Sequence, residues 1–304
     1  MSRLNLGFFY GRVHKAPRIS YDEETGEYNY GMCYLDVVRG LRAVGDDVRF
    51  VKHDKLLIMS REQEMVENMR TWSDNSIIFV KGCISTKKME KKSICDNPDC
   101  LSPENWKAGN LVYITPIYVR KVRDYEDKDE AIEDIVSNRE ISNEIHVIGT
   151  VLRDPKLITT KKGIQFTQYP LAINRKFVIR TDDPSIRTDW PIVKSYGEQA
   201  RSDKTYLKYQ ADVMIDGFLQ GKVVARKCVC ECCGNEYIWK DACMELVPYD
   251  GAVEYIAGHK SREEVEKEVN CTVEEYYQKL YESGFSDVIE DEELRSSDVI
   301  EAEE

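Results

Sequence analysis

The sequence contains 304 residues, enough for two domains of ordinary size or for one large domain. Apolar residues make up 42% and charged residues 32%, so we expect a folded, soluble protein with some strongly solvated segments. No run of 18 or more apolar residues occurs and the N-terminus lacks an apolar signal core, which argues against a membrane-spanning helix and favours a cytoplasmic protein.

The net charge of −12 would disfavour nucleic-acid binding if it were spread evenly over the molecule. The acidic residues are instead concentrated in two segments, residues 124–140 with a net charge of −6 and residues 284–304 with −8. The remainder of the chain therefore carries a net charge of +2. The acidity lies in a linker and a tail, and it does not exclude DNA binding by the folded parts.

Residues 4–123 contain a series of predicted strands separated by turns and glycine bends. Alternating apolar residues predict a strand over residues 6–13, and Gly26 supplies the hairpin turn that follows. Further strands are predicted over residues 33–40 and 77–81, the last of them ending at a glycine. This order is typical of a small β-barrel.

A helix is predicted between the third and fourth strands of this first half. Ser60 and Gln63 have the spacing of a capping box, and Met65, Val66 and Met69 follow as a helical apolar stripe. A small barrel commonly carries a helix at this point, and here the segment is expected to be enlarged. The stripe is typical of a plug that packs against the barrel.

The second half shows the clearest series of strands. Strands are predicted over residues 144–151 and 164–174, with Gly163 at the turn before the second of them. Two more are predicted over residues 188–197 and 206–220. Strands of this length with glycines at bends indicate a small, strongly curved Greek-key barrel.

The two halves share their spacing as well as their order of elements. Gly11 is separated from Gly149 by the same distance in sequence as Pro17 from Pro155, and the bend glycines Gly82 and Gly217 close corresponding strands. A shared order of strand, turn and glycine bend favours an internal duplication. The alternative is two unrelated β-rich domains.

Several spaced pieces of the second half occur in a recognisable order: Ile148-Gly149 with Arg153-Asp154-Pro155, Leu171 to Asn174 before Phe177, Thr188-Asp189-Trp190 before Tyr196-Gly197, and Tyr206-Leu207 before Ile215 to Leu219. In this order they resemble the bacterial and phage single-stranded DNA-binding proteins, which are built on the OB-fold. The resemblance implies an OB-fold barrel for the second half. Together with the repeated spacing and the other features of the chain, it predicts a mostly β protein with two tandem OB-fold barrels, cysteine-bearing hairpins, short C-terminal helices and an acidic tail.

A protein that binds single strands needs flat aromatic faces for bases and cations for phosphates. The resemblance places the stacking aromatics of the second half at Phe177, Trp190 and Tyr196, for which the alternative is a place in the barrel core. In the first half, Phe50 is by order the closest counterpart of Trp190. The other candidate nucleic-acid-binding residues are Arg153, Lys161, Lys162, Arg175, Lys176, Arg12, Tyr28 and Tyr30.

Ten cysteines in a chain expected to be cytoplasmic favour metal binding over disulfides. Cys230 and Cys233, followed by a glycine, resemble a zinc-ribbon knuckle. Cys95 and Cys100 form a second knuckle-like turn, and Cys95 precedes Cys230 by the same interval by which Gly82 precedes Gly217. Ordinary members of the resembled family lack this insertion.

A structural zinc ion needs four ligands, which the two turns can supply in different ways. We favour one ion shared by Cys95, Cys100, Cys230 and Cys233, because each hairpin then supplies only two ligands and the barrels become clamped together. Alternatively, the second hairpin closes its own site with Cys228 or Cys243. Buried thiols without metal are the remaining alternative.

The C-terminal part changes from helical to acidic. Ser261 with Glu264 and Thr272 with Glu275 are capping boxes that predict two short helices. The tail resembles the family tail that recruits replication and repair proteins, with Val288-Ile289 or Val299-Ile300 as anchors, although a solvated charge run is the plain alternative. The predicted domains are 1–123 and 143–257 for the barrels, 124–142 for the acidic linker, 258–284 for the helices and 285–304 for a disordered tail.

The sequence predicts a single-stranded DNA-binding protein without strong sequence preference. It would protect single strands in replication, recombination and repair, in a bacterial cytoplasm at the nucleoid, and the unusual architecture favours a phage or mobile element. We predict no enzyme, because the four histidines are scattered and no phosphate loop or nucleophile elbow occurs. The main alternative is an OB-fold adaptor that binds replication or transcription proteins, and RNA binding is a weaker one. A homodimer is a further expectation.

Overall fold

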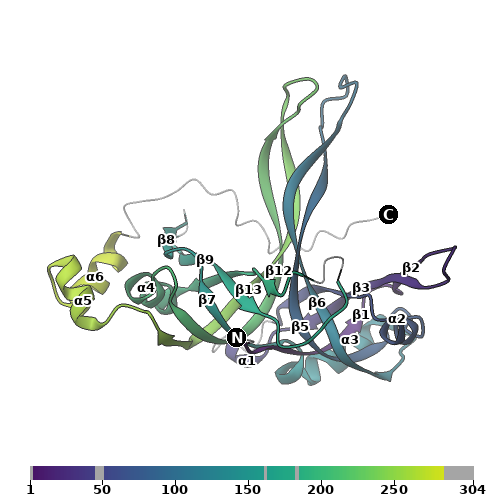
Figure 1. Cartoon of the computed structure of the whole chain (residues 1–304), viewed down its shortest axis with the longest axis horizontal. Helices are drawn as coiled ribbons and strands as arrows, with labels where there is room; N and C mark the ends of the chain where they lie inside the picture. Colours follow the sequence, from purple (N-terminus) through teal and green to yellow (C-terminus); the bar gives the residue numbers. More distant parts are fainter. Residues whose placement is uncertain (1–2, 45–50, 161–162, 182–184, 284–304) are drawn as a thin grey trace.

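The computed structural model describes residues 3–44, 51–160, 163–181 and 185–283. In these residues, thirteen strands form one continuous sheet that curls into two neighbouring barrels, and two long hairpins rise from the barrels as paired arms (Figure 1). No helix in this part of the chain is long and apolar enough to cross a membrane.

The first barrel is closed by five strands. The hydrogen-bonded order is β1–β5–β6–β4–β3, and β3 pairs back with β1 to complete the circle, while β2 extends β3 outward. The strands are β1 (Asn5–Val13), β2 (Arg18–Tyr21), β3 (Tyr28–Val38), β4 (His53–Ser60), β5 (Ile77–Ile94) and β6 (Glu104–Arg123).

The second barrel repeats this arrangement. Its order is β7–β12–β13–β11–β9, with β9 pairing back to β7, and β8 lies beside β9 as β2 lies beside β3. The strands are β7 (Glu144–Val151), β8 (Lys156–Thr159), β9 (Gln165–Asn174), β10 (Thr188–Asp189), β11 (Ile192–Tyr196), β12 (Asp212–Val229) and β13 (Glu236–Ala257). The prediction of a mostly β fold with two OB-fold barrels is confirmed.

The register of the strands repeats as well as their order. Gly7 of β1 pairs with Gly82 of β5, and their counterparts by the spacing of the repeat, Ile145 and Gly217, pair in the second barrel. The barrels are joined where β1 and β7 run antiparallel, with Gly7 opposite Ile145. Because these two opposed residues are themselves counterparts, the junction is symmetric about them, and a pseudo-twofold axis relates the barrels.

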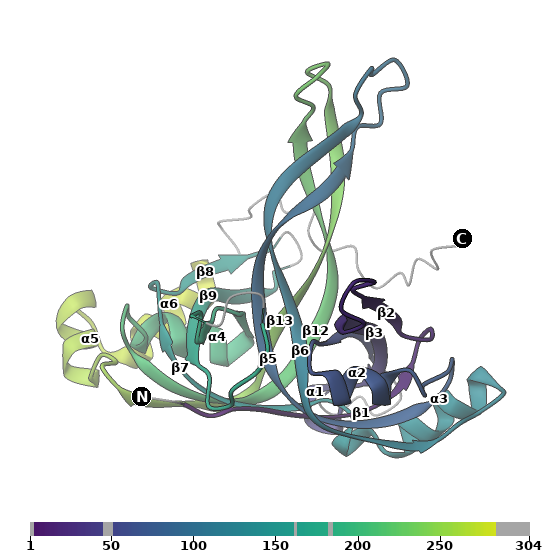
Figure 2. The same ribbon diagram turned by 45° about the vertical axis from the view of Figure 1, so that its right-hand side comes forward.

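The two arms are the continuation of β5–β6 and β12–β13 beyond the barrels. Pairing continues to Ile94 opposite Glu104 in one arm and to Val229 opposite Glu236 in the other. Figure 2 shows the arms crossing as they rise and their tips lying side by side. The sequence predicted hairpins here but not their length, because their polar, lysine-rich strands lack a continuous apolar face.

The core runs through both barrels without a break. One cluster of buried side chains contains Phe9, Ile58 and Ile84 from the first barrel together with Tyr169 and Leu246 from the second. Period-two alternation in the strands turns these side chains inward. The two halves therefore share a core and form one body.

The helices lie around the barrels: α1 (Leu41–Val44), α2 (Gln63–Met69), α3 (Lys128–Ser137), a 3₁₀ turn η1 (Arg139–Ile141), α4 (Gly197–Tyr206), α5 (Arg262–Val269) and α6 (Val273–Ser283). The capping box predicted from Ser60 and Gln63 is wrong. The N-cap of α2 is Glu62, and the Gln63 side chain bonds the backbone of Tyr28 instead. Val66 and Met69 are buried as predicted.

The helix predicted to be enlarged is in fact the shorter of the two barrel helices, with 7 residues in α2 against 10 in α4. Both precede the strand that enters an arm. Helix α4 was missed in the sequence, where a strand was predicted from Tyr206. That residue ends the helix, and β12 begins at Asp212. Ser195, Gln199 and Tyr255 hydrogen-bond the buried carboxylate of Asp203 in α4.

The acidic connector is largely helical and packed. Asp127 caps α3, which buries Ala131 and Ile135, and the Tyr10 hydroxyl of β1 donates to Asp134 at 2.9 Å. The two C-terminal capping boxes are also present, one at Ser261 with Glu264 and one at Thr272 with Glu275. The tail from residue 284, with both predicted anchors, lies outside the described residues.

Candidate nucleic-acid interface and metal centre

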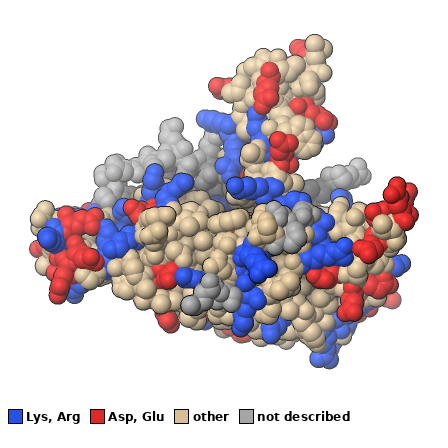
Figure 3. Space-filling view, viewed as in Figure 1, with Lys and Arg blue, Asp and Glu red and all other residues tan. Residues whose placement is uncertain are grey.

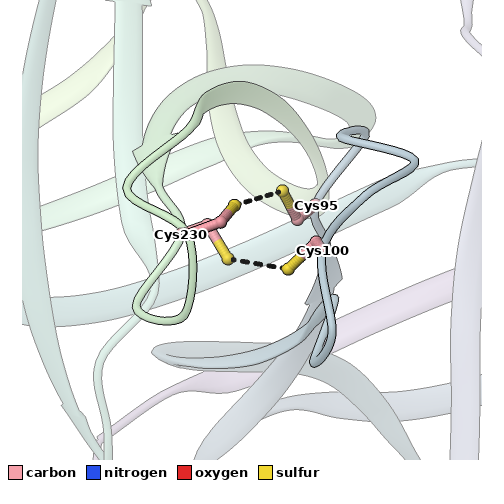
Figure 4. A group of neighbouring side chains, drawn as sticks. Cys95, Cys100 and Cys230 are labelled. Carbon is pink, nitrogen blue, oxygen red and sulfur yellow. Dashed lines mark hydrogen bonds between the residues drawn. The ribbon is translucent and has the colours of Figure 1, made fainter.

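Four cysteines from the two arm tips converge on one point. Cys95 and Cys100 belong to the tip of the first arm, and Cys230 and Cys233 to the tip of the second (Figure 4). Sγ of Cys95 lies 3.7 Å from Sγ of Cys233, Sγ of Cys100 lies 3.6 Å from Sγ of Cys230, and all four lie within 4.8 Å of one another. A disulfide would need about 2.05 Å, so these are four free thiols.

Polar groups surround the sulfurs. The side-chain amide of Asn105 donates to Sγ of Cys230 at 3.5 Å, and that of Asn235 donates to Sγ of Cys95 at 3.7 Å. The backbone amide of Cys233, together with Asn105, lowers the pKa of the Cys230 thiol to about 6. Gly234 has φ +70°, which lets the turn present its amides to the sulfur. These contacts favour the thiolate at Cys230, whereas desolvation raises the pKa of the Cys100 thiol to about 12.

The alternative ligands lie outside this group. Cys228 is half-buried and packs against the edge of the cluster, while Cys232 is exposed. Cys243 lies lower on the second arm, where burial raises the pKa of its thiol to about 11. Among the described residues, the four-sulfur arrangement therefore combines the ligands that were predicted for a shared ion.

Trp190 lies between β10 and β11, at the base of the opposite barrel's arm. Its side chain is partly exposed, and its backbone N–H donates to Oγ1 of Thr86 in β5 at 3.0 Å. The neighbouring Asp189 is fully buried and accepts from the backbone N–H of Thr86 at 2.7 Å. This segment of the second barrel is thus hydrogen-bonded to the first arm.

Arg175 is the partner of Asp189 inside the second barrel. Its Nε and Nη2 donate to the carboxylate at 2.6 and 2.8 Å, and its side chain is only 7% exposed. Arg175 was predicted to contact phosphate. This pairing gives Arg175 a structural role. In the sequence, the residue that could have indicated this role is Asp189 on the neighbouring strand.

The first barrel contains the same device. Nε of Arg39 donates to Asp54 at 2.7 Å, and Asp54 accepts from the backbone N–H of Gly221 in β12 at 3.1 Å. Each carboxylate therefore holds an arginine of its own barrel and the arm base of the other barrel. We call these two sets the Arg–Asp latches. Figure 3 shows lysines and arginines gathered around the level at which the arms leave the barrels.

The other predicted aromatics of the second barrel are half-buried. The Tyr196 ring lies 6.1 Å from that of Phe166, and it also packs against the cluster formed by Phe218 and Tyr249. Phe177 lies in the loop after β9. In that loop, Arg180 bonds two glutamates of the first barrel, so the loop bridges the two barrels. Arg153 and Lys176 are exposed.

The predicted residues of the first barrel are mostly engaged with neighbours. Arg12 is buried, and its guanidinium is held by Asp36 and Asn75, which makes it structural. The Tyr28 hydroxyl donates to Glu67 of α2, and the Arg61 guanidinium lies 5.9 Å from the centre of the Tyr30 ring. The predicted contacts at Phe50, Lys161 and Lys162 fall outside the described residues.

The family model of the single-strand binding protein family matches residues 142–228, which run from the start of β7 to the rising strand of the second arm. This match falls on the second barrel. The resemblance found in the sequence is confirmed. No curated protein matches the chain in sequence.

Solved structures resemble the chain over most of its length. The single-stranded DNA binding protein from Thermus aquaticus is 15% identical with a TM-score of 0.51, and the match covers 86% of this chain and 97% of that one. A deletion mutant of the Thermus aquaticus protein is 16% identical with a TM-score of 0.50, over 86% of this chain and 99% of that one. At this identity the likeness shows the fold.

Within the part that matches the family model, the partly exposed Trp190 and the half-buried Tyr196 flank β11, one before it and one at its end. Lys194 lies between them with its Nζ 3.8 Å from the centre of the Phe166 ring. Lys194 and Phe166 are both buried, so this cation supports the sheet, and the partly exposed Trp190 ring is the face on which a base can stack. This edge of the domain is the candidate nucleic-acid interface.

Proposed function

We propose that this protein binds single-stranded DNA without strong sequence preference and protects it during replication, recombination and repair. The observation that carries the proposal is the match of the second barrel to the single-strand binding family, with Trp190 partly exposed beside β11. Base stacking on an aromatic ring contributes about 1–3 kcal/mol per base and tolerates every base. The protein acts as a binding protein, not an enzyme, at the nucleoid in the cytoplasm.

The test is a fluorescence titration of the whole chain with oligo-dT and with a duplex of the same length, at low and high salt. We expect tryptophan quenching, preference for the single strand and weaker binding at high salt, because phosphate contacts release counterions. Absence of binding to either nucleic acid would reject this function in favour of the adaptor. Binding to oligo-rU as tight as to oligo-dT would reject the DNA preference.

We infer that the two barrels arose by duplication and together stand in for two subunits of an oligomer. The repeated strand order, the constant spacing of paired residues and the pseudo-symmetric pairing of β1 with β7 support this. Unrelated barrels would have no reason to keep the same register through an arm. We further propose that two chains form a homodimer, which sedimentation equilibrium of the purified protein measures directly.

We propose that the four-cysteine cluster holds one structural zinc ion that clamps the arms. Zn–S bonds of about 2.3 Å in a tetrahedron place the sulfurs about 3.8 Å apart, and the Sγ distances of 3.6 and 3.7 Å fit this value. Elemental analysis should find one zinc per chain. Two would indicate separate sites, and none would reject the proposal.

We propose that the acidic tail recruits replication or repair proteins. The support is its net charge of −8 and its two apolar pairs in the sequence. Deletion of residues 285–304 should abolish binding to the recruited enzyme and leave oligo-dT binding intact.

A further inference from the structure

The pseudo-twofold symmetry lets each residue of one barrel be assigned a counterpart in the other. Pro116 and Pro248 pair with the bend glycines Gly82 and Gly217, so these prolines are counterparts in β6 and β13. Ile114 and Leu246, each two positions before its proline, are therefore equivalent. They pair in parallel with Ile58 of β4 and Val193 of β11, which makes those two residues equivalent as well.

The position of Trp190 in the second barrel is then taken by Lys55 in the first. Both lie three positions before the equivalent pair Ile58 and Val193. The Arg–Asp latches support this assignment independently, because Asp54 and Asp189 directly precede Lys55 and Trp190. Phe50, the counterpart expected from sequence order alone, lies five positions too early.

Lys55 and Trp190 occupy equivalent places, each at the base of the other barrel's arm. The Trp190 backbone bonds Thr86 at the base of the first arm, and the carbonyl oxygen of Lys55 lies against Gly221 at the base of the second. A Cβ on Gly221 would lie 2.7 Å from that oxygen, so the approach is close. The Lys55 side chain is exposed, with Nζ 3.3 Å from Nε2 of His14.

The difference extends to the far end of the same strands. The residue six positions later directly follows β4 in the first barrel and is the last residue of β11 in the second. That residue is Arg61 in the first barrel and Tyr196 in the second. Arg61 lies over the Tyr30 ring, whereas Tyr196 lies against Phe166, the equivalent of Tyr30. The first barrel therefore presents cations where the second presents rings.

Resting on the proposed function, we propose that the two barrels divide the contacts to one bound strand. Trp190 stacks a base at the junction of the second barrel, and Lys55 holds a phosphate at the equivalent junction of the first. A dimer of identical subunits would offer both ends of a strand the same contacts. This chain offers them different contacts, so the bound strand has one polarity, with its stacked bases toward one end.

Two oligo-dT probes test the polarity. One has abasic sites in its 5′ half and the other has them in its 3′ half, so the two carry equal charge and length. One probe should bind at least about fivefold more weakly than the other, which is the smallest loss of affinity expected when one base no longer stacks on a ring. The Trp190→Ala variant should bind both probes equally. Equal binding of the two probes by the wild type, with oligo-dT still bound, would overturn the inference.

The salt dependence tests Lys55. For unmodified oligo-dT, Lys55→Gln should lower the slope of log K against log salt by about 0.7, the value for one phosphate on a single strand, and keep the difference between the two abasic probes. Lys128→Gln, an exposed lysine on α3, should leave the slope unchanged. An unchanged slope in Lys55→Gln would overturn the phosphate contact. No binding of any oligonucleotide would instead reject the proposed function.

Discussion

The Arg–Asp latch of the second barrel yields the sharpest prediction of stability. The Asp189 carboxylate is fully buried and accepts four hydrogen bonds, two from Arg175 at 2.6 and 2.8 Å and two from Thr86 at 2.7 and 3.3 Å. The change to test is Asp189→Ala, which removes the acceptor for all four. The Arg175 side chain, 7% exposed, would then be a buried charge without its partner.

The cost follows from this burial. Removing one partner of a buried ion pair destabilises a protein by about 3–5 kcal/mol, because the remaining charge is uncompensated. Asp189→Asn keeps the shape and part of the hydrogen bonding, so a smaller loss of about 1.5–3 kcal/mol is expected for the weakened charged hydrogen bonds. The order wild type, Asn variant, Ala variant is therefore expected in the free energy of unfolding.

Urea unfolding followed by circular dichroism measures the loss, and hydrogen exchange locates it. The amide of Thr86 should exchange faster in Asp189→Ala, because it loses its acceptor, while β-barrel amides far from the latch keep their order of protection. Glu27→Gln is the control: it breaks an exposed pair with Arg180, worth less than about 1 kcal/mol. A free energy of unfolding for Asp189→Ala within about 1 kcal/mol of wild type would falsify the stabilising role of the latch.

Three further predictions concern binding, metal and pH. Trp190→Ala should weaken oligo-dT binding by about 1–3 kcal/mol, and an unchanged affinity in the folded variant would remove this ring from the interface. Cys230→Ser should lose zinc and lower Tm, whereas Cys232→Ser, an exposed neighbour outside the cluster, should keep both; equal zinc content in the two variants would contradict the assigned ligand set. Burial raises the pKa of Asp203 from 3.8 to about 6, so the folded protein holds this proton more tightly than the unfolded chain. The raised pKa of Asp203 therefore adds on the order of 3 kcal/mol to the free energy of unfolding at low pH. This contribution is full below about pH 4 and is lost as the pH rises through about 6. Asp203→Asn should remove that fall from the pH profile of unfolding, and an identical profile would refute the assignment.

Local patterns were sufficient where the local environment decides the structure. The alternation of Glu144 to Val151 predicts β7 with its observed bounds, since every second side chain of that strand is buried. The C-terminal capping boxes are closed within a single helical turn, and both were predicted. The cysteine spacing likewise indicated two matching turns at the tips of equivalent hairpins.

Local patterns failed where a distant partner competed. Gln63 has the spacing of a capping residue, but the Tyr28 backbone, 35 residues away, takes its side chain. Helix α4 was missed although its buried Asp203 is bonded by Gln199 of the same helix, because the carboxylate is also bonded by Tyr169 of β9 and Tyr255 of β13. These strand partners of Asp203, like the Tyr28 partner of Gln63, lie outside a local window of sequence.

The sequence by itself determined the β-barrels, their repeated order of strands, the likeness of the second one to the single-strand binding family and the four cysteines able to share an ion. Only the tertiary structure decided which charges are available, because Arg12 and Arg175 are withdrawn into ion pairs by carboxylates from neighbouring strands. It also decided that Lys55 stands where the other barrel has Trp190. Barrel closure and the pairing of β1 with β7 set that register, and these contacts join residues far apart in the sequence.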